Sequence, residues 1–579
     1  SAIIRELELL FAHYAVYLAY IDGKQVANLA ADEISALTLD KLLSCIVNLD
    51  QVAPLIHVPG QRYKGLQGEV AAAEKIQATV RMHLQRKNYA VFRRTTRAAL
   101  VIQRFWRSRI SIYHLVQALA DLQTSRLNAF KQLQMTFFRR YASLKERKRV
   151  IIHLPSFGAE SFQRHSMEYL ATFQNSQMAR LTSLQDPRVE VIYIAPFPLS
   201  DEILHYYYKI LSLGGVQDAE KRLRVVTPEN YLKFPEHFSL STHLLYSPRA
   251  MRKIRTLIRG KDAYVVPSLV GVDDIKLCVA LNVPLMGSLP DIANTYSTKS
   301  GAKRIFASAE VNTPPAAFDL FSEMEVYARL AALIVRNMDV QRWILKIDDE
   351  FGGRGHAHID VSSLESYAIL LRDYQSLTDE EWLHPTVQAA AVERLQDELQ
   401  QNLHKHVVVA KKSIYRKFKQ YLEAFTRVGG VIEACPPEIR GSPSANLYIE
   451  PNGAITVLST HDQIFYKDYS FLGATFPQLS VPPVALHSAC LAIGNALYAK
   501  QIIGYVGVDF VTFWDEPEMT QRLWAVDLNI RMTDTAVAFN LFHFVSRGRF
   551  DASSGNYYLP AAEGKEPETR SFVIHNSLQ

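Results

Sequence analysis

Residues 344–361, "ILKIDDEFGGRGHAHIDV", bring a lysine, three acids and a group of glycines close together. Lys346 ends an apolar run, and Gly352, Gly353 and Gly355 follow the acids. A lysine beside backbone without side chains can hold a phosphate, whereas the acids suit Mg²⁺ and water. The stretch is equally typical of a surface hairpin whose glycines only make the turn. These residues alone leave both interpretations open.

Two later segments supply the oxygen ligands that Mg²⁺ prefers. Asp509 lies in "GYVGVDFV", and Asp527 and Asn529 lie in "AVDLNIR". Alternate residues of a strand face the same side, so Asp527, Asn529 and Arg531 are expected to project together. Two carboxylates and an amide oxygen fit Mg²⁺ that shares phosphate oxygens, and lysines would supply the countercharge. Each residue taken singly could instead cap a turn or lie in solvent.

The run "GVIEACPPEI" suits the base and sugar of a nucleotide. The backbone around Glu433 and Cys435 could hydrogen-bond the edge of an adenine before two prolines end the strand. Glu433 or Glu438 could then bind a ribose hydroxyl.

These residues need elements to position them, and 579 residues are too many for a single core. We expect an amphipathic helical segment at 1–65 and a long helix at 66–149, where no proline occurs and no glycine follows Gly68. At 150–297, short Val- and Ile-rich runs such as "VEVIYIAPF", "HLLYSP" and "VPLMGS" alternate with helical segments. This alternation predicts a parallel α/β sheet. Residues 298–579 predict an α+β domain, opened by a helix that carries Lys303.

Composition excludes several classes of protein. The four cysteines are far apart and form no CxxC pair, which argues against a disulfide scaffold or zinc site and favours a reducing compartment. The longest apolar run, Leu9 to Ile21, is too short for a membrane span. Glu6 and Glu8 stand where a signal peptide would need basic residues. A cytoplasmic protein is therefore predicted.

The basic charge is concentrated in the long helix. Between Lys75 and Arg149 there are 18 Lys and Arg against only Asp121 and Glu146, a local net charge of +16. The remaining residues carry a net charge of −10. Such a helix suits an acidic partner, which could be a protein, a nucleic acid or a membrane surface.

Two segments of this helix match the spacing IQxxxRxxxxR. The first, "KIQATVRMHLQRK", is complete, and "VIQRFWRSRISIY" starts its motif 26 residues later with Ile112 in place of the last arginine. This is the signature of IQ motifs, which bind calmodulin or a calmodulin-like light chain through an apolar stripe and arginines. A solvated helix packed on the body and an RNA-binding helix are the alternatives. The expected calmodulin-binding residues are Ile76, Gln77, Arg81, Arg86, Ile102, Gln103, Phe105, Trp106 and Arg107.

The order of motifs over about 150–579 resembles the ATP-grasp family, and within it the pheganomycin-type peptide ligases. "STKSGAKRIFASAEVNTPP" is similar to the first-lysine helix, and "ILKIDDEFGGRGHA" to the second lysine and glycine flap. "VIEA" resembles the adenine hinge, and "GVDFV" with "AVDLNIR" resembles the metal-binding strands. The runs "GSPSANLYIEPNGAITVLSTHDQIF", "LGATFP" and "RGRFDASSGNYY" make the resemblance specific.

The resemblance implies ATP-dependent ligation of a carboxylate to an amine, with ATP and Mg²⁺ as cofactors. It implies phosphate binding by Lys303 and Lys346, Mg²⁺ binding by Asp509, Asp527 and Asn529, and an acyl phosphate held by Arg531. His461, Asp462 and Gln463 would lie near the γ-phosphate or the acceptor. The relatives usually have glutamate where Asp527 stands, and a glycine-rich turn ending in His-Pro where this chain has "MTDTAVAF".

The combination of IQ motifs with this ATP-grasp region resembles the IQ domain-containing protein H family. That resemblance implies calmodulin binding and a place in the axoneme of cilia or flagella, especially in sperm. Two hypotheses follow from it. The chain is either a calmodulin-regulated ligase or a structural axonemal module whose ATP-grasp fold is catalytically inactive.

Overall fold

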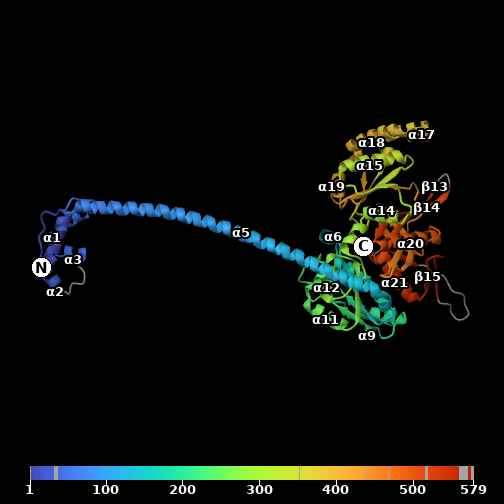
Figure 1. Ribbon diagram of the computed structural model, residues 1–579, viewed down its shortest axis with the longest axis horizontal. Helices are drawn as coiled ribbons and strands as arrows, with labels where there is room; N and C mark the ends of the chain where they lie inside the picture. Colours follow the sequence, from blue (N-terminus) through green and yellow to red (C-terminus); the bar gives the residue numbers. More distant parts are fainter. Residues whose placement is uncertain are drawn as a thin grey trace. The chain divides into compact units, whose positions relative to one another are not determined.

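The computed structural model describes residues 2–31, 37–350, 352–436, 438–466, 469–515, 519–559 and 572–575. The chain divides into two compact units, Ser1–Asp121 and Leu122–Gln579. The long helix α5 (Gly68–Lys145) contributes residues to both units (Figure 1). Within the described ranges no helix combines the length and apolar character needed to cross a membrane.

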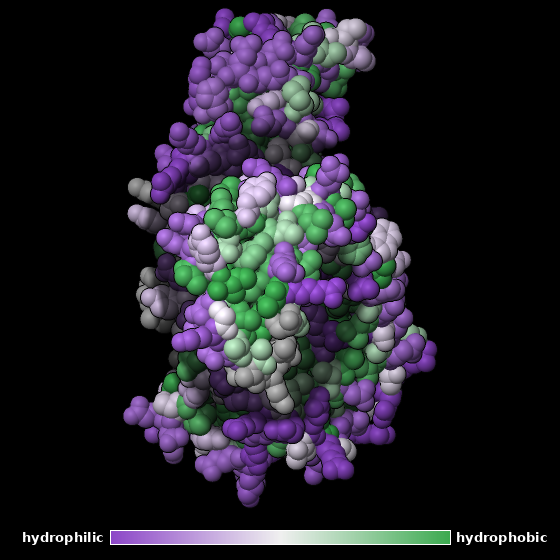
Figure 2. All heavy atoms as spheres, turned by 90° about the vertical axis from the view of Figure 1, so that its left-hand side faces the viewer, coloured by the Kyte–Doolittle hydropathy of each residue, from purple (hydrophilic) through white to green (hydrophobic). Residues whose placement is uncertain are grey.

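The N-terminal unit begins with the predicted amphipathic helices. They bury a small core that includes Ile3, Leu7, Val52 and Ile56. Other apolar side chains stay outside, and Figure 2, which looks onto these helices, shows apolar residues gathered on that face. Tyr17 is 96% exposed. The helices are α1 (Ala2–Tyr14), α2 (Gly23–Ala31), α3 (Leu39–Leu43) and α4 (Leu49–His57), followed by the 3₁₀ turn η1 (Gln61–Tyr63).

Helix α5 is one continuous helix of 78 residues. Residues 74–125 are exposed on all sides, whereas Phe130, Phe137 and Tyr141 are buried in the cores of the larger unit. The side chain of Gln134 accepts a hydrogen bond from the backbone N–H of Leu285 at 2.8 Å. The last turns of α5 therefore belong to the larger unit.

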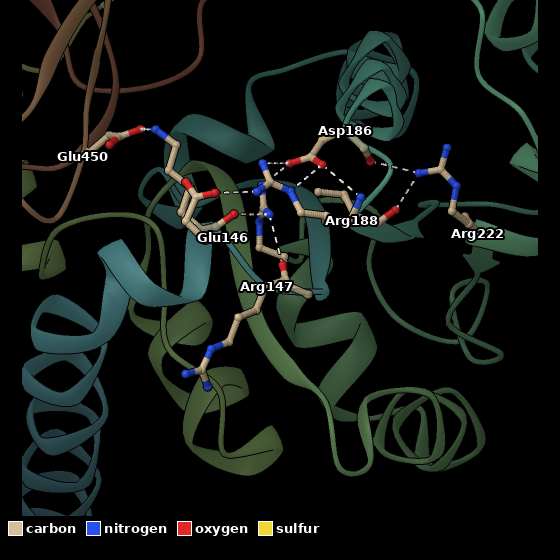
Figure 3. A network of polar contacts seen from close by, with 9 residues as sticks. Glu146, Arg147, Asp186, Arg188, Arg222 and Glu450 are labelled. Carbon is tan, nitrogen blue, oxygen red and sulfur yellow. Dashed lines mark hydrogen bonds and ion pairs between the residues drawn. The ribbon is translucent and has the colours of Figure 1, made fainter.

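Ion pairs fix the end of α5 to two different sheets (Figure 3). Lys145 contacts the buried carboxylate of Glu450 at 2.6 Å. Arg149, at the start of the first strand, contacts Asp186 at 2.9 Å, and Arg188 contacts Glu146 at 2.6 Å. Both partners of the Arg149–Asp186 pair are largely shielded from water. Removal of one partner should therefore lower the free energy of unfolding more than removal of one partner of an exposed pair would.

The predicted parallel sheet is present, with strand order β3-β2-β1-β4. It contains β1 (Arg149–Phe157), β2 (Val189–Ile194), β3 (Leu223–Val226) and β4 (Asp262–Leu269). Two expected strands are wrong. "HLLYSP" begins in the last turn of helix α10 (Leu240–Leu245), where Ser239 caps the first turn, and "VPLMGS" contributes only a bridge from Leu285 to Val265. Short apolar runs cannot be assigned to strand or helix by pattern alone.

An antiparallel sheet of order β5-β9-β6-β7-β8 carries the glycine hairpin. Trp343, Leu345 and Ile347 point into a core that helices on one side of the sheet complete, while alternate residues face the other way. The strands are β5 (Ala316–Ala317), β6 (Arg342–Ile347), β7 (His356–Asp360), β8 (Val408–Val409) and β9 (Gly430–Cys435). The helices are α15 (Glu323–Arg336), α18 (Pro385–His406) and α19 (Phe418–Val428) (Figure 1).

A second antiparallel sheet of order β14-β13-β10-β11-β12-β17 carries the expected metal strands. Leu447, Val506 and Val508 on one face pack with helix α20 (Pro483–Ala499), and the opposite face is polar. The strands are β10 (Pro443–Ile449), β11 (Ile455–Tyr466), β12 (Ser470–Phe476), β13 (Gly504–Asp515), β14 (Thr520–Asn529) and β17 (Phe572–His575). Of these strands, β13 and β14 contain the segments that the sequence predicted as metal-binding strands.

The remaining elements cover or connect the sheets. Helices α13 (Pro290–Ser297) and α14 (Lys299–Ser308) precede the glycine hairpin, and α21 (Asp534–Ser546) follows the last metal strand. The others are α6 (Ser161–His165), α7 (Leu170–Asn175), η2 (Ser176–Gln185), α8 (Asp201–Leu213), α9 (Ala219–Arg222), α11 (Pro248–Ile258), α12 (Val272–Leu281), η3 (Val361–Ser363), α16 (Glu365–Ser376), α17 (Asp379–Trp382), β15 (Arg549–Asp551) and β16 (Asn556–Tyr558).

Candidate functional site

Helix α14 places two lysines on one face. Thr298 caps it by accepting a hydrogen bond from the backbone N–H of Gly301 at 2.9 Å. Gly301 permits a close approach, because a Cβ there would lie 2.1 Å from the carbonyl oxygen of Thr295. Lys299 and Lys303 are four residues apart, so both ammonium groups point to the same side.

Lys303 meets Lys346 at a single carboxylate. Lys303 Nζ lies 2.6 Å from Glu433, Lys346 contacts the same carboxylate, and all three side chains are less than 10% exposed. Burial opposes ionisation of Glu433, but the two lysines lower its pKa to about 2. Burial lowers the pKa of Lys303, whereas Glu433 and Asp527 outweigh burial and raise the pKa of Lys346. Two buried cations thus share one anion, which leaves room for a further negative charge.

The two expected metal carboxylates lie opposite each other on β13 and β14. Asp509 pairs with Asp527 in the strand register. Gln463 donates to Asp509 at 2.9 Å and Asn529 donates to its other oxygen at 3.1 Å. Both oxygens of Asp527 lie 2.7 Å from Lys299 Nζ.

Burial and then the charge of Asp527 raise the pKa of Asp509 to about 7. Burial acts in the same sense on Asp527, but Lys299 and Lys346 outweigh it and lower the pKa of that carboxyl. The two carboxylates therefore differ: one has only neutral hydrogen-bond donors, and the other has an ammonium group.

The polar face of this sheet continues along β11, where alternation separates the predicted residues. His461 and Gln463 lie on the same face as Asp509, and His461 is fully buried with Nε2 2.9 Å from Ser459 Oγ. Asp462 points to the other face, where it accepts the backbone N–H groups of Leu479 at 2.6 Å and Ser480 at 3.2 Å. The structure therefore brings Gln463 to the carboxylates and gives Asp462 a capping position.

The glycine hairpin between β6 and β7 needs its glycines. Gly352 and Gly353 have φ of +62° and +75°, which favours residues without a Cβ. A Cβ on Gly353 would lie 2.8 Å from the carbonyl oxygen of Tyr469, and one on Gly355 would lie 2.6 Å from Glu350 Cβ. The loop therefore packs closely against its neighbours, and the backbone at its glycines is not covered by side chains of their own.

The residues expected at the base and sugar are placed less uniformly. Cys435 is buried at the end of β9, opposite Arg342. Glu438 is exposed, and its carboxylate pairs with Arg440 at 2.9 Å. Arg531 follows the end of β14, and its charge acts on Asp509 to lower the pKa of that carboxyl. The roles of these residues stay predictions.

Sequence reasoning missed Lys299, Asp348 and His356. Asp348 accepts the backbone N–H of Ser300 at 2.7 Å, so the strand with Lys346 is tied to the helix with Lys303. His356 lies opposite Lys346, and burial together with the charges of Lys346 and Lys299 lowers its pKa to about 3. The spacing of Lys299 and Lys303 on one helix was a signal for the first, but nothing in the local pattern distinguished Asp348.

Comparison with protein families matches the arrangement around these residues. Residues 290–553, which hold both lysines, the glycine hairpin and the carboxylate strands, match the family described as "IQCH-like, ATP-grasp". Residues 290–553 form an IQCH-like ATP-grasp domain. Residues 71–90 and 96–111 of α5 match the IQ calmodulin-binding motif. The expected ATP-grasp fold and the two IQ motifs are confirmed.

A curated relative extends the resemblance to nearly the whole chain. The chain is 33% identical to IQ motif-containing protein H of Danio rerio over 97% of its own length. It spans about half (55%) of the length of that relative. The resemblance to the IQ domain-containing protein H family is confirmed on these matches.

Among solved structures, the chain is similar to two biotin carboxylases. One is the biotin carboxylase domain of 2-oxoglutarate carboxylase from Hydrogenobacter thermophilus, in complex with MgADP, ADP and bicarbonate. It shares 14% identity over 71% of this chain and 73% of that chain, with a TM-score of 0.38. The other is biotin carboxylase from Campylobacter jejuni, at 13% identity over 74% and 75%, also with a TM-score of 0.38.

Proposed function

We propose that the IQCH-like ATP-grasp domain binds ATP with Mg²⁺ at the lysines and carboxylates described above. The observation that carries this proposal is the pair of buried lysines, Lys303 and Lys346, that share the single carboxylate of Glu433. Buried charges are usually compensated one for one, since an uncompensated charge away from water is costly. A polyphosphate entering beside the bare backbone of Gly352 and Gly353 would supply the missing negative charge.

The carboxylate strands fit a Mg²⁺ ion that is shared with phosphate. Asp509, Asp527 and the amide oxygen of Asn529 are the candidate ligands, on two neighbouring strands. In the described part of the chain no group of three or more His, Cys, Asp and Glu residues is arranged to hold a metal. Mg²⁺ here would therefore depend on waters and phosphate oxygens for its remaining ligands, as it usually does at nucleotide sites.

The resemblance to the pheganomycin-type peptide ligases supports, as the reaction of the domain, ligation of a carboxylate to an amine at the expense of ATP. Bound Mg²⁺ would neutralise phosphate charge, and the residues of this chain would bind, align and shield the reacting groups. Lys303 and Lys346 would orient the phosphates, and Arg531 would hold the activated carboxylate. Gln463 and His461 lie on the same polar face of the sheet, and in this proposal they would lie near the γ-phosphate or the acceptor.

A catalytically inactive module is the second candidate, and one feature favours it. Asn446 donates to Ser459 at 3.1 Å and to Thr535 at 3.0 Å, and Thr533 donates to Asn446 at 2.6 Å. This network joins the start of α21 to the polar face of the sheet, beside His461. These side chains form hydrogen bonds with one another, so no amine substrate is needed to complete their hydrogen bonding.

The test of nucleotide binding compares wild type with Lys346→Ala by isothermal titration with ATP and Mg²⁺. We expect the substitution to weaken binding by about 1.5–3 kcal/mol, the usual worth of a hydrogen bond to a charged group. Lys261→Ala, which removes a half-exposed lysine paired with Glu190, is the control and should leave the affinity unchanged. Equal affinities of Lys346→Ala and wild type would remove Lys346 from the site. No binding at millimolar ATP would end the proposal.

The choice between ligase and inactive module needs a separate measurement. Phosphate release is followed in the presence of a library of amino acids and short peptides. Stimulation of release by one acceptor supports the ligase, and bound nucleotide without turnover for any acceptor supports the inactive module.

We further propose that α5 binds calmodulin or a calmodulin-like light chain through its two IQ motifs. The apolar residues of the motifs lie on an isolated helix: Ile76, Ile102, Phe105 and Trp106 are each 63–67% exposed. An acidic partner with apolar grooves would cover these residues and match the positive charge. RNA remains the less favoured partner. A place in the axoneme of cilia or flagella, alongside other axonemal proteins, completes the proposal and rests on the family resemblance alone.

A further inference from the structure

Lys299 contacts both carboxylate oxygens of Asp527, one of the three candidate Mg²⁺ ligands. Its ammonium nitrogen lies 2.7 Å from each of the two carboxylate oxygens, so both oxygens are engaged at once. The Lys299 side chain is only 10% exposed. An exposed lysine could leave its partner at little cost, but this one is held among neighbouring side chains and backbone.

The surroundings of Lys299 fix it in place. Its backbone N–H donates to the carbonyl oxygen of Asp348 at 3.2 Å, and the next N–H donates to the Asp348 carboxylate at 2.7 Å. The residue therefore begins a capped helix that is tied to the strand of Lys346. Its ammonium group can move only as far as its own side-chain torsions allow.

Asp509 differs in a way that matters for a cation. Its two oxygens accept hydrogen bonds from the amide groups of Gln463 at 2.9 Å and Asn529 at 3.1 Å. An amide that turns over presents its oxygen in place of its nitrogen, so both neighbours can become ligands. A lysine has no acceptor atom and keeps its charge, so it repels a divalent ion placed on the same carboxylate.

We propose that Lys299 acts as a built-in cation on Asp527. Of the three candidate ligands named above, Asp527 is then taken by Lys299, and the site holds a single divalent cation through Asp509 and Asn529. This inference rests on the proposed nucleotide function, but the effect of Lys299 on divalent-cation binding can be measured without nucleotide. Lys299 is in this sense a specificity-determining residue for the number of metal ions.

The experiment counts Mn²⁺ ions bound to the full chain from the electron paramagnetic resonance signal of free Mn²⁺. Titrations are made with Mn²⁺ alone and with Mn²⁺ plus adenylyl imidodiphosphate. Wild type is compared with Lys299→Met, which keeps much of the side-chain volume and removes the charge. The matched control is Lys276→Met, which removes the same charge from an ion pair with Asp273 at 2.8 Å, outside the site.

With nucleotide present, we expect one Mn²⁺ per wild-type chain and two per Lys299→Met chain. With Mn²⁺ alone, we expect Lys299→Met to bind at least ten-fold more tightly than wild type, and Lys276→Met to match wild type. Circular dichroism and the melting temperature verify that each variant is folded.

Three results would overturn the inference: two ions bound by wild type with nucleotide, a folded Lys299→Met variant with wild-type metal binding, or an equal gain in the control. The wild-type stoichiometry needs no variant, so it decides even where Lys299→Met does not fold. If the analogue does not bind at all, the proposed nucleotide function fails, and the titration with Mn²⁺ alone still tests the role of Lys299.

Discussion

At the scale of single residues, the site is organised around carboxylates that hold lysines in place. Glu433 joins the lysine of α14 to the lysine of β6, and Asp527 joins α14 to β14 through Lys299. One helix is thereby linked to both antiparallel sheets before any ligand is present. Preorganised charge of this kind binds an anion without having to be assembled first.

Asp348 is expected to be a positioning residue in this arrangement. It is 5% exposed, and its carboxylate accepts the backbone N–H of Ser300 in the first turn of α14. Removal of such a cap typically costs about 0.5–2 kcal/mol. Asp348→Ala should lower the melting temperature and weaken Mg·ATP binding about three- to ten-fold, while Asp348→Asn, which keeps an acceptor oxygen, should restore most of both.

Asp319 provides the control, because its carboxylate pairs with Arg304 on the exposed side of the same helix at 2.6 Å. An exposed pair contributes about 0–1 kcal/mol, so Asp319→Ala should leave the ATP affinity unchanged. An Asp348→Ala variant with wild-type melting temperature and affinity would show that the cap does not position the lysines.

Asp274 gives the larger unit a pH dependence of stability. Its carboxyl is buried, and burial raises its pKa to about 7. The folded state therefore holds this proton more tightly than the unfolded state, so the stability that Asp274 contributes is fully present below about pH 4 and is lost as the pH rises through about 7. Asp274→Asn removes this titration. Between pH 5 and pH 8, the melting temperature of wild type should fall more than that of the variant, by an amount worth about 2.6 kcal/mol.

The site residues predicted from sequence were those whose side-chain type suits phosphate or Mg²⁺. Lys303, Lys346, Asp509 and Asp527 lie together, as their order along the chain indicated. The family resemblance grouped Asp462 with His461 and Gln463, but adjacent residues of a strand face opposite sides. Its carboxylate instead caps the turn at 479–480. Asp348 was expected, with the neighbouring acids, to face Mg²⁺ and water. The sequence does not show that helix α14, whose first turn it binds, begins beside it.

At the scale of elements, α5 is long, basic and exposed over both IQ motifs. The double substitution Ile76→Asp and Ile102→Asp places a charge at the start of each apolar stripe. We expect it to abolish binding of calmodulin measured by titration calorimetry, because a buried carboxylate without a partner is costly. The ATP-grasp domain should remain folded.

The matched control changes two exposed apolar residues of the same helix that lie outside the motifs, Leu115→Asp and Leu119→Asp. It introduces the same charge and the same helix propensity, and binding should be retained. Unchanged binding after both isoleucine substitutions would mean that the motif match is accidental and that α5 serves another partner.

Substitutions in the glycine hairpin can distinguish the strain of a positive φ from the clash of an added Cβ with neighbouring atoms. Gly352 and Gly353 both have positive φ, but a Cβ at Gly352 meets nothing within 4 Å, whereas one at Gly353 lies 2.8 Å from the backbone of Tyr469. Gly352→Ala should cost about 1 kcal/mol from strain alone. Gly353→Ala should cost about 1–2 kcal/mol more, since backbone must shift. Thermal unfolding of both variants measures the difference, and equal effects would mean that Tyr469 does not confine the loop.

Elements with a strong pattern were predicted well, and short ones were not. The absence of proline and glycine predicted α5 as a long helix or a pair of helices, and it is one helix. "HLLYSP" was expected to be a strand because it is short, apolar and closed by proline, but the preceding serine starts a helix. Strand β12 was missed because "SFLGATF" contains a glycine and its apolar residues do not alternate regularly with polar ones.

At the scale of the whole molecule, the chain consists of two compact units with different expected ligands. The residues proposed to bind nucleotide all lie within 122–579, and the IQ motifs lie within 1–121. The chain spans about half (55%) of the length of its curated relative. Each proposed ligand can therefore be tested against the unit that should bind it.

Scanning calorimetry of the full chain should resolve this division. A chain of two units is not expected to unfold in a single two-state transition. ATP with Mg²⁺ at about 100 times its dissociation constant stabilises the unit that binds it by about 2.7 kcal/mol. For a unit as large as residues 122–579, this corresponds to an upward shift of about 3 °C in its transition. The transition of the smaller unit should stay at the same temperature, because a ligand stabilises only the unit whose folded state binds it.

The Lys346→Ala variant at the same ATP concentration should show a smaller shift of the transition of the larger unit. A shift confined to the smaller transition, or an equal shift in wild type and variant, would place the nucleotide away from the lysines of the ATP-grasp domain.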